Sequence, residues 1–156
     1  MRRLALFIST VGYVGYAPFA PGTFGSAAGL AVFYAVRSTG STAVELVTIV
    51  VLFAIGIWSG TAAEHHFGGV DPGPIVLDEV VGMLITLCLL PVSPMGAFVG
   101  FLVFRVLDVI KPFPSARFEK LPGGLGVMAD DSMAAIYGNL VMRALLAVAP
   151  DALRNT

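Results

Sequence analysis

The sequence predicts an all-α protein, a small polytopic bundle of membrane helices that forms one domain over residues 1–156. Hydrophobic residues make up 57% of the chain and charged residues 12%, compared with about 25% charged residues in soluble domains. A soluble protein of this size has too much surface for its volume to bury so many apolar side chains. The apolar residues also gather in long runs, which is typical of membrane helices.

Five apolar runs divide the chain. A helix that crosses a bilayer needs about 20 apolar residues, with about 17–25 tolerated. The runs cover residues 23–36, 42–63, 80–90, 95–110 and 133–148. The second run is the clearest, whereas the third is short and is stopped by Pro91. Together with a short N-terminal helical segment, which can pair with the first run as a hairpin, they predict four to six membrane helices.

The first twenty residues are similar to a secretory signal peptide, because Arg2 and Arg3 precede an apolar stretch and small residues. Glycines and tyrosines interrupt the apolar stretch, however. We therefore expect a retained interfacial or re-entrant segment.

The polar motifs all fall on one side of the membrane if each run crosses it once. The second run ends near Ala63, so DPGPIVLDE (residues 71–79) lies on this side. The fourth run returns to it with RVLDVIKPFP (residues 105–114), and the first and fifth runs start from it. Positive residues favour cytoplasmic loops. This side carries Lys111, Arg117 and Lys120, whereas the opposite side carries Arg37 and Arg154. Because the positive excess lies on the side of the polar motifs, we expect that side to be cytoplasmic.

The sequence lacks the features that several classes of function require. The net charge is −1 and there is no basic stripe, so we expect no nucleic-acid partner. Cys88 is the single cysteine and cannot form an intrachain disulfide. His65 and His66 lack the spacing of zinc ligands, and no GxSxG or Cys-x5-Arg nucleophile motif occurs. We expect Glu45, at the start of the second run, to be a solvated flanking residue.

Two pairs of adjacent acids are the strongest candidates for a metal site. Asp78 and Glu79 precede the third run, and Asp130 and Asp131 precede the fifth. An acid at a helix start can cap free N–H groups, but capping explains one acid better than two with Asp71 nearby. Crowded carboxylates favour a cation between them, and oxygen ligands without thiolates favour Mg²⁺. Because adjacent helical residues point about 100° apart, we expect the second pair at a loop-to-helix junction.

Three charged residues follow in the fourth run. Arg105, Asp108 and Lys111 are spaced i, i+3 and i+6, so they share one broad helical face. An internal ion pair would ease burial of the helix end, but it needs only two of the three. Arginine and lysine beside carboxylates suit a phosphate group.

The motif GTFGS (residues 22–26) opens the first run and allows two interpretations. Free N–H groups at a helix start bind anions, and Thr23 and Ser26 add hydroxyl donors. Alternatively, Gly25 and Gly29 form a small-residue contact for helix packing. Both can hold together. The glycines of residues 123–126 are a weaker candidate for a phosphate-binding nest.

In this order, GTFGS, DPGPIVLDEVVG, RVLDVIKPFP and GGLGVMADD resemble the phosphatidylglycerophosphatase A family over residues 21–139. The ordered set is specific, although each motif alone is weak. The resemblance implies a multi-pass enzyme of the inner (cytoplasmic) membrane with its active site facing the cytoplasm. Such an enzyme hydrolyses phosphatidylglycerophosphate to phosphatidylglycerol and phosphate and requires Mg²⁺. The chain departs from the family at Leu77, where an aromatic residue is common, and at Ala134–Ala135, where an Ala-Gly step is usual.

The resemblance covers Asp78, Glu79, Asp108, Lys111, Asp130 and Asp131, and residue chemistry adds Arg105, Thr23 and Ser26 as phosphate-binding candidates. We expect Asp130, Asp131 and Asp78 or Glu79 to bind Mg²⁺, and Glu79, Asp108 and Lys111 to be catalytic. Arg105, Lys111, Thr23 and Ser26 are expected to bind the lipid phosphate. Two other functions would also collect carboxylates in a membrane protein. A cation transporter would place them near the midplane, and a non-catalytic scaffold would use them only as helix caps.

Overall fold

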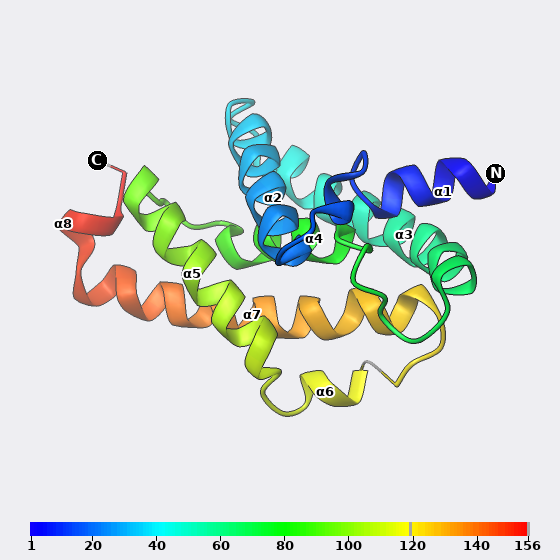
Figure 1. Ribbon diagram of the computed structural model, residues 1–156. Coiled ribbons are helices and arrows are strands. Elements are labelled where there is room, and N and C mark those ends of the chain that lie inside the picture. The colour runs from blue at the N-terminus through cyan, green and yellow to red at the C-terminus, as the bar shows by residue number, and fades with distance from the viewer. Residues whose placement is uncertain (119, 156) are drawn as a thin grey trace.

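The computed structural model describes residues 1–118 and 120–155, and these residues form an all-α bundle (Figure 1). Within them the only β pairing is an isolated bridge between Val92 and Arg154. The predicted all-α class is therefore confirmed. The elements, in chain order, are α1 (Arg2–Ser9), a 3-10 turn (Val14–Tyr16), α2 (Pro21–Arg37), α3 (Thr42–Phe67), α4 (Leu77–Leu87), α5 (Pro94–Ile110), α6 (Ser115–Phe118), α7 (Gly124–Val148) and α8 (Pro150–Leu153).

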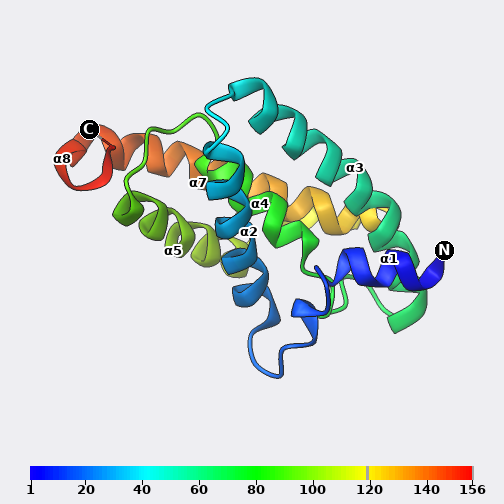
Figure 2. The same ribbon diagram turned by 90° about the horizontal axis from the view of Figure 1, so that it is seen from above.

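The short helix α4 lies at the centre of the bundle. It packs against α2, α3, α5 and α7, and Figure 2 shows it between α2 and α7. Nine of its 11 residues are buried. Its apolar side chains Met83, Leu84 and Leu87 join the main core cluster with residues of α2, α5 and α7. The surrounding helices therefore determine where both ends of α4 lie.

Glycines allow the helices to approach α4 and one another closely. A Cβ atom on Gly29 of α2 would lie 2.8 Å from the Met83 Cβ and 2.9 Å from the Val80 Cα of α4. Gly25 contacts Val76 in the same way. The predicted packing role of Gly25 and Gly29 is therefore confirmed. Larger residues at these positions would push α2 away from α4.

A second close approach joins α3 and α7. A Cβ atom on Gly124 would lie 2.3 Å from the Ile57 carbonyl oxygen, and the Gly124 N–H donates to the Thr61 hydroxyl at 2.9 Å. In the structure, Gly124 therefore serves helix packing. Its N–H is already bonded and does not contribute to a phosphate nest.

The C-terminal end of α4 is capped by a side chain from α7. The last carbonyl groups of a helix have no partner within the helix. The two N–H groups of the Asn139 side-chain amide are shared among the carbonyls of Ile85, Thr86 and Cys88, which lie at 3.1, 3.1 and 2.9 Å from the amide nitrogen. These bonds satisfy the end of a helix that lies inside the bundle. They also tie α4 to α7 far from the acidic end of α4.

One helix among the described residues, α3, is long and apolar enough to cross a membrane by length and composition. It has 26 residues, a mean hydropathy of 2.1, and only 22% of its apolar window buried. Helix α4 has 11 residues and is about 16 Å long, roughly half of a hydrocarbon core of about 30 Å. It is a buried central helix and cannot cross alone. The expectation of four to six membrane helices is therefore not confirmed.

Two local expectations differ from the structure. The N-terminal helix α1 packs against α3, whereas the 3-10 turn contacts α2, so α1 and α2 do not form the expected hairpin. Glu45 is 7% exposed and is not a solvated flank. Its carboxylate accepts a hydrogen bond from the Leu89 N–H at 3.1 Å and lies 3.9 Å from Arg37 Nη1. It thereby anchors the turn that follows α4.

We predict that Asn139→Leu destabilises the protein, because the carbonyls at the end of α4 lose their donor inside the bundle. The free energy of unfolding should fall by about 1–3 kcal/mol, measured by thermal or denaturant unfolding of the purified protein. Arg143→Ala is the control, because it removes only an exposed hydrogen bond to Asn139 and should change stability by less than about 0.5 kcal/mol. Equal effects of both substitutions would contradict the capping role.

Candidate active site

Four helices bring their polar residues together at one end of the bundle. The first turn of α4 supplies Asp78 and Glu79, the last turns of α5 supply Arg105 and Asp108, and α7 supplies Asp131. Gly22 in the first turn of α2 closes the group, because its backbone lies against Glu79 and Arg105. Segments far apart in the sequence therefore meet at one site. This juxtaposition agrees with the expectation that the polar motifs share one side.

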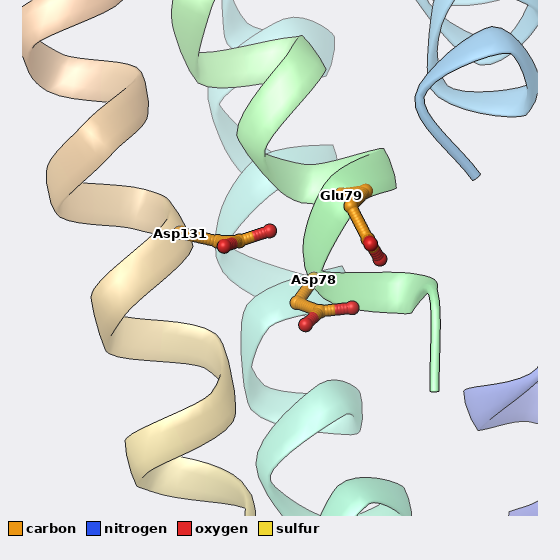
Figure 3. Close-up of side chains that lie close together, drawn as sticks. All are labelled: Asp78, Glu79 and Asp131. Carbon is orange, nitrogen blue, oxygen red and sulfur yellow. The ribbon is translucent and has the colours of Figure 1, made fainter. Parts of the chain in front are cut away.

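Asp78, Glu79 and Asp131 form a buried carboxylate cluster (Figure 3). One carboxylate oxygen from each residue lies within 4.8 Å of the others. Asp78 and Asp131 are each 3% exposed. Figure 3 shows Asp131 pointing from α7 toward the first turn of α4, where Asp78 and Glu79 lie. In this acidic cluster, side chains from two helices face a common point.

Each acid in the cluster retains a buried oxygen that accepts no hydrogen bond from the described residues: Asp78 Oδ1, Glu79 Oε2 and Asp131 Oδ2. Helix capping does not account for these oxygens, since the N-cap residue of α4 is Val76 and no side chain caps the helix there. Buried polar atoms without partners are costly. Their presence in one small volume is what a cation site requires.

The electrostatics of the cluster also favour a cation. Burial raises the pKa of Asp78, and the neighbouring Glu79 carboxylate raises it further. Burial, then the charge of Asp78, raises the pKa of Asp131. Burial raises the pKa of Glu79 from 4.5 to about 8. All three carboxylates are therefore hard to ionise together without a positive ion, and three oxygen ligands fit Mg²⁺.

Asp130 and Asp131 do not act as a pair. We expected both at a loop-to-helix junction, but α7 begins at Gly124, so both lie about two turns inside the helix. They consequently point in different directions. Asp131 joins the acidic cluster, whereas Asp130 accepts a hydrogen bond from Lys111 Nζ at 2.5 Å. Asp130 is therefore not brought into the group that could hold a metal ion.

Two cationic side chains flank the acidic cluster. Arg105 Nη1 donates to Asp108 and lies 3.8 Å from Glu79 Oε1. Lys111 Nζ also lies 3.7 Å from Asp71 Oδ2, so the DPGP loop reaches the site through Asp71. Arg105 and Lys111 are each about one-fifth to one-quarter exposed. They can therefore contact an anion that approaches from the open side.

The structure gives the two hydroxyl residues of the GTFGS motif different environments. The Ser26 hydroxyl is fully buried and donates to the Gly22 carbonyl at 2.9 Å, within its own helix. Thr23 is half-buried in the first turn of α2. Sequence reasoning assigned no separate role to Gly22, yet a Cβ atom there would lie 2.2 Å from Glu79 Oε1 and 3.0 Å from both terminal nitrogens of Arg105. In the sequence, the glycine at this position of the motif was the one feature that could have indicated such a close approach.

The chain is similar to a known family and to several known proteins. The family model described as Phosphatidylglycerophosphatase A matches residues 7–146. A Haemophilus influenzae protein named "Phosphatidylglycerophosphatase A" is 38% identical over 125 residues, which cover 79% of this chain and 77% of the relative. An Escherichia coli protein of the same name is 36% identical over 116 residues, covering 73% of this chain and 67% of the relative.

A third relative carries a different name. A Bacteroides thetaiotaomicron protein named "Putative phosphatidylinositol-3-phosphatase" is 36% identical over 98 residues, which cover 60% of this chain and 61% of the relative. No solved structure matches the chain. From the family match and its first relatives, the chain belongs to the phosphatidylglycerophosphatase A family, which is a family of phosphatase enzymes.

We predict that Mg²⁺ stabilises the folded protein most strongly at alkaline pH. Without divalent cations, unfolded Glu79 ionises near 4.5 whereas folded Glu79 keeps its proton until about 8. The folded state therefore binds more protons in this window, and the free energy of unfolding should fall as pH rises through it. Bound Mg²⁺ should remove this decline. Thermal unfolding at both ends of the window, with chelator or Mg²⁺, tests the effect. A Tm that ignores Mg²⁺ at the alkaline end would argue against a cation in the acidic cluster.

We also predict that Gly22→Ala weakens Mg²⁺ binding, because the new methyl group displaces the Glu79 carboxylate or the Arg105 guanidinium. The stabilisation by Mg²⁺ should be largely lost, while the Tm in chelator changes little. Gly73→Ala is the matched control, because the nearest atom to its Cβ would be 4.0 Å away, on Pro21. If both variants respond to Mg²⁺ like the unaltered chain, Gly22 does not shape the site.

Proposed function

We propose that this protein is a Mg²⁺-dependent membrane phosphatase that converts phosphatidylglycerophosphate to phosphatidylglycerol and phosphate. The observation that carries the proposal is the acidic cluster with its three unpartnered oxygens, flanked by Arg105 and Lys111, in a member of this family. A site for a hard cation beside two positive side chains suits a phosphomonoester dianion. The two relatives named "Phosphatidylglycerophosphatase A" support the choice of phosphatidylglycerophosphate as the substrate.

The residues divide into two groups around the lipid phosphate. Asp78, Glu79 and Asp131 would hold Mg²⁺, which when bound neutralises charge on phosphoryl oxygens and polarises water. Lys111 and Arg105 would bind the phosphate oxygens through charge-assisted hydrogen bonds. Asp130 contacts Lys111 and is therefore assigned to positioning that ammonium group. Thr23 remains a candidate phosphate donor at the start of α2, whereas the Ser26 hydroxyl is already bonded to Gly22.

Hydrolysis needs a group that accepts a proton from the attacking water. Asp108 or Glu79 would act as this general base, because both lie next to Arg105 at the open side of the acidic cluster. The water oxygen forms a new bond to phosphorus as the bond to the glycerol oxygen breaks. The glycerol oxygen leaves as an alcohol after it gains a proton, and inorganic phosphate is released. An aspartyl-phosphate intermediate is the alternative route.

We further propose that the protein lies in the inner membrane with the active site at the cytoplasmic face. Helix α3 supports the membrane location, because it is long and apolar enough to cross a bilayer and only 22% of its apolar window is buried. The 17-residue helices α2 and α5 are at the lower limit for crossing. Together with residues 133–148 of α7, helices α2 and α5 would surround α4. The two aspartates of α7 precede residues 133–148.

Exposed apolar side chains on these helices also support a lipid environment. Water disfavours large contiguous apolar surfaces on a soluble monomer. On α3 and α5 the exposed large hydrophobic residues include Val47, Val50, Val51, Trp58, Phe98, Leu102, Val106 and Val109. A cation transporter is less well supported, because Asp78 and Glu79 lie in the first turn of α4 and Asp108 lies in the last turn of α5, near the ends of these helices.

We predict that Asp78→Asn and Asp131→Asn each lower phosphate release from phosphatidylglycerophosphate by about a hundredfold or more. Each change removes a charged cation ligand while keeping the side-chain size. Asp151→Asn, on exposed α8, should keep full activity. Release should require Mg²⁺ in the unaltered protein. Phosphatidic acid and phosphatidylinositol 3-phosphate belong in the same assay, and faster hydrolysis of either would reassign the substrate. Undiminished turnover in both site variants would reject the site.

A further inference from the structure

We propose that a groove between α5 and α7 holds one acyl chain of the lipid while its phosphate lies at Lys111, so that the enzyme selects long-chain lipids over soluble phosphomonoesters. This inference rests on the proposed lipid phosphatase function. It adds a binding site for the apolar part of the substrate, outside the acidic cluster.

The α5–α7 groove is lined by apolar side chains alone: Leu102, Val103, Val106, Leu107 and Val141. Its volume is about 290 Å³. Leu102, Val106 and Val141 are 47%, 55% and 41% exposed, so the groove is open along its length. An open groove without polar groups cannot form hydrogen bonds or ion pairs with a headgroup or an ion. Its chemistry fits a hydrocarbon chain.

The groove lies along the C-terminal half of α5, which ends at the active site. Val103 and Leu107 are spaced i and i+4 and form a row on the helix surface, and Lys111, the C-cap residue just after the end of α5, lies four residues further on. The first two line the groove, and the third contacts Asp130 and Asp71. A chain lying along this row would therefore end at a positive side chain in the site. This change from apolar to cationic matches the order of groups in a phospholipid.

Helix α7 contributes Val141 to the other side of the groove. Tyr137 precedes Val141 by four residues, so both lie on one face of α7. The Tyr137 hydroxyl donates to the Phe113 carbonyl at 3.0 Å. Phe113 lies two residues after Lys111, so this bond joins α7 to the segment that follows α5. The phosphate end of the groove thus has a fixed position relative to Lys111.

Because lipid tails in a bilayer already lie among apolar groups, the groove adds little affinity there. Its effect is to orient the lipid. A chain fixed between α5 and α7 restricts where the attached phosphate lies relative to the acids, and such positioning accelerates reaction. Val50 on α3, which is also exposed, does not lie on a row that reaches a charged residue of the site.

Photo-crosslinking tests occupancy of the groove without relying on turnover. A lipid with a diazirine in one acyl chain and a terminal phosphomonoester is compared with the same lipid without the terminal phosphate, both in detergent with the full chain. We expect mass spectrometry to find the phosphorylated probe on residues 102–107 and 141, with several-fold less labelling by the other probe. Equal labelling by both, or labelling elsewhere, would mean ordinary lipid contact and would overturn the proposal.

Substrate selectivity provides the second test. Val141→Trp fills the groove and should lower kcat/KM for long-chain phosphatidylglycerophosphate about tenfold, while leaving a water-soluble short-chain analogue unchanged. Val50→Trp, on the exposed face of α3, should leave both unchanged. An unaltered ratio of the two rates in Val141→Trp would overturn the groove but not the phosphatase function. If the unaltered chain hydrolyses neither substrate, the phosphatase function fails, and crosslinking still decides the groove.

Discussion

Three carboxylates buried side by side impose the main constraint on this structure. Removing an ionised carboxylate from water is costly, and placing two more beside it adds repulsion. Asp78 and Asp131 are almost fully buried, and each member of the acidic cluster keeps an oxygen without a partner among the described residues. A fold stabilised only by its apolar core would gain nothing from this arrangement. The surrounding helices therefore serve to keep the carboxylates together, and the proposed divalent cation would offset their repulsion.

The bundle satisfies this constraint by enclosing the short helix α4. Glycines at 25 and 29 bring α2 against one side of α4, and α7 covers another. Within α7, the two adjacent aspartates are directed to different tasks by the turn of the helix. Asp131 faces the carboxylates of α4, and Asp130 pairs with Lys111. Adjacent residues thus supply one member of the acidic cluster and the ion-pair partner of Lys111.

The sequence was sufficient to predict the all-α class and the meeting of the polar motifs at one end. Alternating directions of successive apolar runs bring the starts and ends of different runs to the same side, so motif order alone carries this information. We expected both Asp130 and Asp131 beside Asp78 or Glu79, and the structure brings Asp131 to Asp78 and Glu79 without Asp130. The separation of Asp130 from Asp131 could not be predicted, because the start of α7 depends on the contact of Gly124 with α3, which local sequence does not encode.

Burial of individual residues was harder to predict for the same reason. Glu45 has the sequence context of a flank, yet tertiary contacts with Leu89 and Arg37 bury it. The partner of the N-terminal helix was also mistaken, since apolar pattern gives the faces of a helix but not its neighbour. The length of α4 was visible in the sequence, whereas its enclosure by four other helices required the structure.

Both ends of α4 are fastened to the same neighbour. Asp131 of α7 meets the first turn of α4, and Asn139, further along α7, binds its last carbonyls. At about 1.5 Å per residue, these two attachments are about 12 Å apart along α7. Helix α7 therefore contacts α4 near both of its ends and restrains it from sliding along its own axis. The same two contacts hold the carboxylates of α4 at a set position relative to Asp131.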